Sequence, residues 1–288
     1  MLFFIRLITN RSPLVLKIVL WETGLILQYI LKYRSKVILS NLESSVGFQY
    51  SKEQIKNIHK KYYSVLIRYI REVFYIISYD KIRLKSLIKI DNAEKWSNYF
   101  QLQKSTIITA SHYGNWEMNM VLLPCFVRQR VIAFYKPISD TTIDNIMLKI
   151  RSAFGLELYP IEQTMRVMNH LRDENILYIF IGDQTPLNMN GVYWNMFLHQ
   201  ATPWLTGAEK LAKKYNLPVL YLQQIPETES NISYTLRFHI ITENPDHEAS
   251  GSITEKYSRI LENEIIAKPE YWLWSHKRWK RAHHKTID

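Results

Sequence analysis

The chain has 288 residues, of which 47% are hydrophobic and 13% aromatic, and its formal net charge is +11. This length suffices for one large α/β domain with a small attached segment, and the single cysteine excludes a disulfide within the chain, which fits a reducing compartment. A basic, aromatic-rich chain suits an anionic membrane surface, an anionic substrate or nucleic acid. The sequence has no helix-turn-helix, zinc or RNA-recognition motif, so we expect no nucleic-acid partner.

Residues 1–36 are predicted to be a membrane-associated segment. Residues 14–31 have about the length that crosses a bilayer, but Lys17 and Glu22 interrupt the apolar run. An ionisable group near the hydrocarbon centre costs about 2.5–3.5 kcal/mol. We therefore expect a helix that lies on the membrane or inserts shallowly, with residues 37–288 forming one domain.

The rest of the chain alternates between helical and strand patterns. A capping-box spacing between Ser51 and Gln54 begins a long amphipathic helix that continues to about Ile77. Continuous apolar runs predict strands at 106–110, 131–135, 176–181, 218–222 and 234–241. Helical patterns lie at 117–126, 141–153, 161–172 and 205–215. Because the strand patterns are continuous rather than alternating, we predict an α/β fold with a central, mostly parallel sheet and helices on both faces.

The most informative stretch follows the first of these strands and contains His112 and Glu117. Residues five apart lie about 140° apart around a continuous helix, so these two side chains would not share a face. They can meet only if His112 lies in a loop and Glu117 on the first turns of the next helix. Gly114 and Asn115 are the residue types that permit such a turn and cap such a helix. A histidine paired with a carboxylate is suited to activating a hydroxyl.

Two further polar clusters follow predicted strands. Tyr135-Lys136-Pro137 follows the second strand, and Gly182-Asp183-Gln184 follows the third. Sites in parallel sheets gather at the carboxyl ends of the strands, so we expect both clusters to converge with His112. The alternative for Asp183 is a purely structural cap of a turn.

The chain resembles the lipid A biosynthesis (lauroyl/myristoyl) acyltransferases, within the lysophospholipid-acyltransferase-like superfamily. The resemblance includes the His-x4-Glu motif of His112 and Glu117, and it ends in the tryptophan-rich segment 269–280. Between them it includes 135–137, Arg151 and the Asp183-Gln184 pair. It covers almost the whole chain in order. One departure is Leu198-His199, where the family usually has a Phe-Gly pair.

The resemblance implies transfer of a fatty acyl group from acyl carrier protein to a hydroxyl of a lipid A precursor, an anionic glycolipid. It also implies attachment to the cytoplasmic face of the bacterial inner membrane, and no cofactor or metal. His112 would be the general base, supported by Glu117. The residues expected to bind substrate are Asn115, Lys136, Arg151, Asp183 and Gln184.

Two interpretations are open for the tryptophans near the carboxyl end. Trp272, Trp274 and Trp279 stand beside basic residues, which would suit anchoring at an anionic lipid interface. The alternative is that these tryptophans close the core while the basic tail is solvated.

Other functions remain as alternatives. The same superfamily includes acyltransferases that act on other glycolipids or on lysophospholipids. The lysophospholipid enzymes usually have Asp at the second motif position and a later Phe-Pro-Glu-Gly segment, which this sequence lacks. A basic protein that only binds membranes or nucleic acid is the non-enzymatic alternative. The sequence has no Gly-x-Ser-x-Gly elbow and no His-Glu-x-x-His motif, so neither a serine hydrolase nor a zinc protease is indicated.

Overall fold

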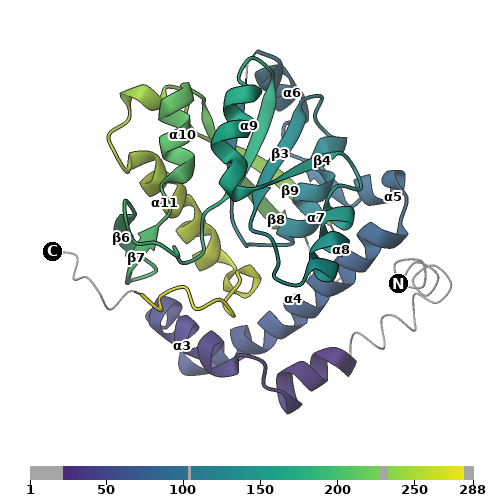
Figure 1. The fold of residues 1–288 in the computed structure, drawn as a ribbon. Coiled ribbons are helices and arrows are strands. Elements are labelled where there is room, and N and C mark those ends of the chain that lie inside the picture. Colours follow the sequence, from purple (N-terminus) through teal and green to yellow (C-terminus); the bar gives the residue numbers. More distant parts are fainter. Residues whose placement is uncertain (1–21, 103–104, 228–232, 282–288) are drawn as a thin grey trace.

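The computed structural model describes residues 22–102, 105–227 and 233–281, and its centre is a seven-stranded sheet (Figure 1). The strand order is β1-β9-β8-β2-β5-β3-β4, and all neighbours are parallel except β8 and β9. The predicted α/β class with a mostly parallel sheet is confirmed. The strands are β1 (Ile88–Ile90), β2 (Thr106–Ala110), β3 (Arg130–Tyr135), β4 (Leu156–Pro160), β5 (Ile176–Ile181), β8 (Val219–Pro226) and β9 (Tyr234–Thr242).

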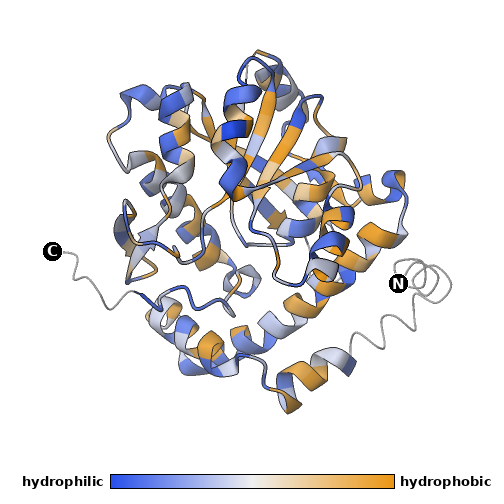
Figure 2. Ribbon diagram, viewed as in Figure 1, coloured by the Kyte–Doolittle hydropathy of each residue, from blue (hydrophilic) through white to orange (hydrophobic). Residues whose placement is uncertain are grey.

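Helices cover both faces of this sheet because successive strand residues point to opposite sides. In β2 every residue is buried: Ile107 packs into one apolar core and Ile108 into the other. Figure 2 shows the hydrophobic residues gathered along the central strands. The first core includes α3 (Ser35–Val46), most of α4 (Lys52–Ser78), α9 (Thr164–His170), α10 (Gly207–Tyr215) and α11 (Ser252–Ala267). The second includes α5 (Lys81–Lys85), α6 (Ala93–Leu102), α7 (Trp116–Leu122) and α8 (Thr141–Arg151).

The long helix predicted from the Ser51 capping box is α4. The backbone N–H of Ser51 donates to the Gln54 side chain at 2.8 Å, and the Gln54 N–H donates to the Ser51 hydroxyl at 3.3 Å. The helix ends at Ser78, one residue beyond the expected boundary, and extends across the lower part of Figure 1. Its apolar face packs on the first core.

Some elements were not predicted, for identifiable reasons. β1 has only three residues, and β4 is a partly exposed edge strand without a long apolar run. A separate hairpin joins β6 (Tyr193–Phe197) to β7 (Gln200–Trp204) through Leu198 and His199, which have φ values of 50° and 61°. A two-residue turn with positive φ at both positions favours Asn, Asp or Gly there, so Leu-His carries no turn signal.

The predicted membrane-associated segment, residues 1–36, lies mostly outside the described residues. Of its described part, Ile26–Ile30 forms a short π-helix. Tyr29 is 54% exposed, Ile30 73% and Leu31 64%, so this stretch presents apolar side chains to its surroundings. Within residues 22–102, 105–227 and 233–281, no helix is both long and apolar enough to cross a membrane.

A buried carboxyl group on α11 gives the fold a specific pH dependence. Glu264 is buried and accepts a hydrogen bond from the Tyr221 hydroxyl. Burial raises the pKa of Glu264 to about 8, because the desolvated carboxylate is stabilised only in part by hydrogen bonds. The native state therefore keeps this proton up to about pH 8, whereas the unfolded chain releases it near the ordinary value of 4.5.

We expect the free energy of unfolding to fall as the pH rises from about 5 to about 9, because the unfolded state loses the Glu264 proton first. In Glu264→Gln, which is uncharged and keeps an acceptor for Tyr221, this decline should be smaller. Urea unfolding across that pH range measures it. Equal declines in the two proteins would show that Glu264 is not the group responsible.

Candidate active site

The register of the sheet brings His112 and Asp183 together. β2 and β5 are parallel neighbours, and Ala110 is paired with Ile181. The segments that follow these two residues therefore leave the same edge of the sheet at the same level. β3, which leads to Lys136, is the next strand beyond β5. The predicted convergence of these loops is confirmed for His112 and Asp183, which are in direct contact. Lys136 follows the adjacent strand at the same edge of the sheet.

Asp183 holds both the backbone and the ring of His112. One carboxylate oxygen lies 2.6 Å from His112 Nδ1, and the other accepts the His112 backbone N–H at 2.9 Å. The second oxygen also accepts the Trp272 indole N–H at 2.9 Å. Asp183 is 2% exposed, so these groups supply the hydrogen bonds that water would otherwise donate to its carboxylate. Its role goes well beyond capping a turn.

This arrangement sets the tautomer of the imidazole. Burial opposes ionisation of Asp183, but His112 and the hydrogen bonds from His112 and Trp272 outweigh it and lower its pKa below the ordinary value. An ionised carboxylate accepts, so we assign the ring proton to Nδ1, which leaves the lone pair on Nε2. The Gln184 amide nitrogen lies 3.1 Å from Nε2 and donates to it. The His112 side chain is 16% exposed, so a ligand can reach the ring.

The turn after His112 is formed as predicted. Gly114 has a φ of +61°, and a Cβ there would lie 3.3 Å from the Gln224 backbone carbonyl oxygen and the Gln224 Cβ. Asn115 is the N-cap of α7, and its side-chain oxygen accepts the Met118 N–H at 3.0 Å. Only glycine combines the required φ with this close approach, so the loop that carries His112 has one well-defined path.

The carboxyl-terminal segment completes the site. The Gly114 N–H donates to the Tyr271 carbonyl at 3.1 Å, and the Leu273 N–H donates to the His112 carbonyl at 3.1 Å. The same segment brings the Trp272 indole to Asp183. No local pattern in the sequence indicated this contact, since the two residues are far apart in the chain.

The tryptophans of this segment are core residues. Trp272, Trp274 and Trp279 are all buried and belong to the first apolar core. Of the two interpretations of these side chains, the one in which they close the core is confirmed, and the one in which they anchor the protein at a lipid interface is wrong.

The predicted pairing of Glu117 with His112 is not formed in the structure. Glu117 accepts from Arg151 Nε at 2.8 Å and also pairs with Arg151 Nη2, and within the described residues no hydrogen bond joins it to His112. The reason is geometric: α7 packs against α8, which carries Arg151, whereas the loop turns the His112 ring toward β5. The carboxylate that orients the imidazole is Asp183 instead.

The other residues predicted to bind substrate differ in accessibility. Asn115 is 2% exposed, and its amide also donates to the Glu72 carboxylate at 2.6 Å, so this side chain is committed to the fold. Lys136 is exposed and makes no ion pair with any described residue. Arg151 uses Nε and Nη2 for Glu117, which leaves Nη1 for a ligand. Gln184 lies against the imidazole.

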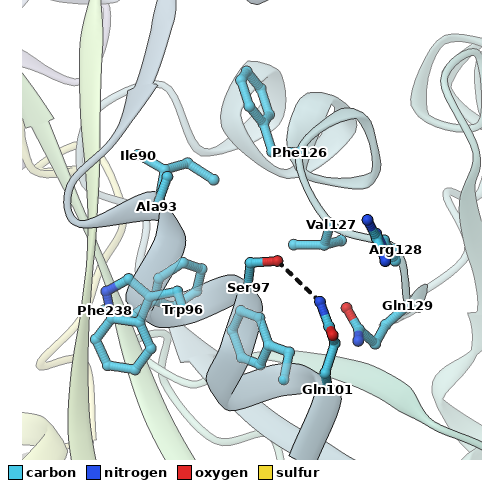
Figure 3. Close-up of a pocket in the computed structure, with 11 residues that line it drawn as sticks. Ile90, Ala93, Trp96, Ser97, Gln101, Phe126, Val127, Arg128, Gln129 and Phe238 are labelled. Atoms are coloured by element: carbon cyan, nitrogen blue, oxygen red, sulfur yellow. Dashed lines mark hydrogen bonds between the residues drawn. The ribbon is translucent and has the colours of Figure 1, made fainter.

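Two hollows lie away from this site. One, of about 60 Å³, lies between α6, which contributes Trp96, and the segment around Phe126 that leads into β3 (Figure 3). The other, of about 470 Å³, is lined in part by Ser105, which precedes β2. Both hollows adjoin segments that lead into the amino ends of strands, whereas His112 follows the carboxyl end of a strand. Small-molecule sites usually measure about 300–1,000 Å³, so the first is too small for an acyl chain.

The site lies at the carboxyl edge of a mostly parallel sheet, where α/β enzymes usually bind their ligands, and its imidazole–carboxylate pair is chemically able to take a proton from a hydroxyl. The family model described as bacterial lipid A biosynthesis acyltransferase matches residues 2–281, and the chain belongs to this family. It is therefore an acyltransferase. No curated protein matches the chain.

Among the described residues, no group of three or more His, Cys, Asp or Glu side chains is placed to hold a metal ion.

Proposed function

We propose that this protein transfers a fatty acyl group from the thioester of acyl carrier protein to a hydroxyl of a lipid A precursor, with His112 as the general base. The observation that carries this is the chain of contacts Asp183–His112–Gln184; with the ring proton assigned to Nδ1, the lone pair of His112 Nε2 faces a hydrogen-bond donor. A substrate hydroxyl that replaced the Gln184 amide would present its proton to the same lone pair.

The reaction then needs a group that accepts the hydroxyl proton and later returns a proton to the leaving sulfur. His112 Nε2 takes the hydroxyl proton while the oxygen attacks the thioester carbonyl. The tetrahedral centre collapses, the C–S bond breaks and the sulfur leaves with the proton that the imidazolium returns. Asp183 stabilises the imidazolium in between and keeps the ring from rotating. Trp116, whose ring meets the imidazole edge-on at 5.0 Å between centroids, supports the same orientation.

We assign the binding of the anionic acceptor to Lys136 and Arg151. Lys136 is exposed at the edge where β3 ends, next to β5, the strand that leads to Asp183. The free Nη1 of Arg151 suits a phosphate oxygen, and the pairing with Glu117 holds the guanidinium in place. Glu117 acts in this proposal through Arg151 rather than as the partner of the base.

The proposed localisation is the cytoplasmic face of the bacterial inner membrane. Two features support a membrane surface: the net charge of +11 and the exposed apolar side chains around Ile26–Ile30. The same positive charge would attract acyl carrier protein, which is acidic, and an anionic glycolipid.

The test is acyl transfer by purified His112→Ala, with acyl carrier protein as donor and a lipid A precursor as acceptor. We expect turnover to fall by at least about 10³-fold, because alanine cannot accept the proton of the hydroxyl, while the thermal unfolding midpoint stays near that of the wild type. Mass spectrometry of the product follows the added chain. Turnover within a few-fold of the wild type would refute the assignment of the base.

A further inference from the structure

A second buried carboxylate, Glu72 on α4, lies directly behind the catalytic loop. Its side chain has no exposed surface and accepts three hydrogen bonds. The donors are Arg68 Nε at 2.7 Å, Asn115 Nδ2 at 2.6 Å and the Tyr234 hydroxyl at 2.7 Å. Arg68 balances the charge within the same helix, so this carboxylate remains stable without water.

The Asn115 amide links Glu72 to the catalytic loop. Only its nitrogen can donate to Glu72, so its oxygen must point the other way, to the Met118 N–H at 3.0 Å. Glu72 therefore fixes which end of the amide caps α7. The cap in turn fixes where the loop from His112 to Asn115 joins the helix, immediately after the Gly114 turn.

We propose that Glu72 is a positioning residue for acyl transfer, which sets the placement of His112 through the Asn115 cap. This inference rests on the proposed role of His112. Glu72 touches neither the substrate nor the imidazole. Its effect is confined to geometry, and a displacement of about 1 Å at a reacting group can lower a rate by roughly 10²-fold.

The experiment compares Glu72→Gln with Glu209→Gln. Glu209 is a similarly buried carboxylate that accepts from the Gly251 N–H and from Thr254, at the start of α11 and away from the loop. Both variants should lower the thermal unfolding midpoint, since each loses charge-assisted hydrogen bonds. Only Glu72→Gln should lower kcat, by about 10- to 100-fold, with KM for donor and acceptor within about 2-fold of the wild type.

A second variant removes the link without changing the charge. Asn115→Ser keeps a capping oxygen and loses the amide donor to Glu72, so its kcat should fall to a similar extent. The double variant should be no slower than the slower single one, because both changes break one unit. If Glu72→Gln does not fold, the proposal is tested by the kcat of Asn115→Ser alone.

Three results would overturn the proposal: an unchanged kcat in Glu72→Gln, an unchanged kcat in Asn115→Ser, or kcat losses in Glu72→Gln and Glu209→Gln that simply follow their losses of stability. His112→Ala, measured in parallel, separates the two hypotheses. If it stays active, the assignment of the base fails. If it is inactive while Glu72→Gln keeps full kcat, only the role of Glu72 fails.

Discussion

Substituting Asp183→Asn should lower the turnover number by roughly 10³- to 10⁴-fold, the largest loss expected from changing one atom in this protein. The asparagine fills the same space but has no charge to stabilise the imidazolium. Its amide can also turn its nitrogen toward His112 Nδ1, which would favour the tautomer that places the proton on Nε2 and removes the base. Steady-state acyl transfer at saturating substrates measures the effect.

The control for this prediction must separate loss of catalysis from loss of stability. Asp183 also accepts from Trp272 and from the His112 backbone, so Asp183→Asn will lose some stability, and activity should be compared well below the unfolding midpoint. Trp272→Phe keeps the carboxylate and loses the indole donor together with part of a buried ring, so it should cost stability but retain much more activity. A turnover number within about 10-fold of the wild type in Asp183→Asn would contradict the assigned role of the carboxylate.

Glu117→Gln is expected to lower kcat/KM by about 10- to 100-fold, clearly less than Asp183→Asn. The reason is that Glu117 acts through Arg151, to which it is paired in a partly buried site with side chains 17% and 21% exposed. Loss of the carboxylate frees the guanidinium from its position, so the effect should be greatest on KM for the anionic acceptor.

A double-mutant cycle tests this division of roles. Glu117→Gln and Arg151→Gln should be strongly non-additive, because the second change removes little once the pair is broken. Glu117→Gln and Asp183→Asn should be closer to additive in free energy, since they affect different steps. If Glu117→Gln lost more turnover than Asp183→Asn, then Glu117 rather than Asp183 would be the carboxylate that supports the base.

Residue patterns were sufficient for much of this protein. Continuous apolar runs such as 106–110 and 176–181 predicted buried parallel strands, because burial on both faces allows no polar alternation. The Gly114 turn and the Asn115 cap followed from residue types whose conformational preferences are local. The general position of the site followed too, since carboxyl ends of parallel strands share an edge.

The partners within the site depended on the tertiary structure. His112 and Asp183 are 71 positions apart, and they meet because β5 pairs with β2 in one particular register. The nearer carboxylate, Glu117, pairs with Arg151 because α7 packs against α8. Trp272 and Glu72 reach the site from the carboxyl-terminal segment and from α4. Spacing along the chain fixes the direction of a side chain only within one helix or strand, whereas the pairing of charges across elements is decided by packing and register.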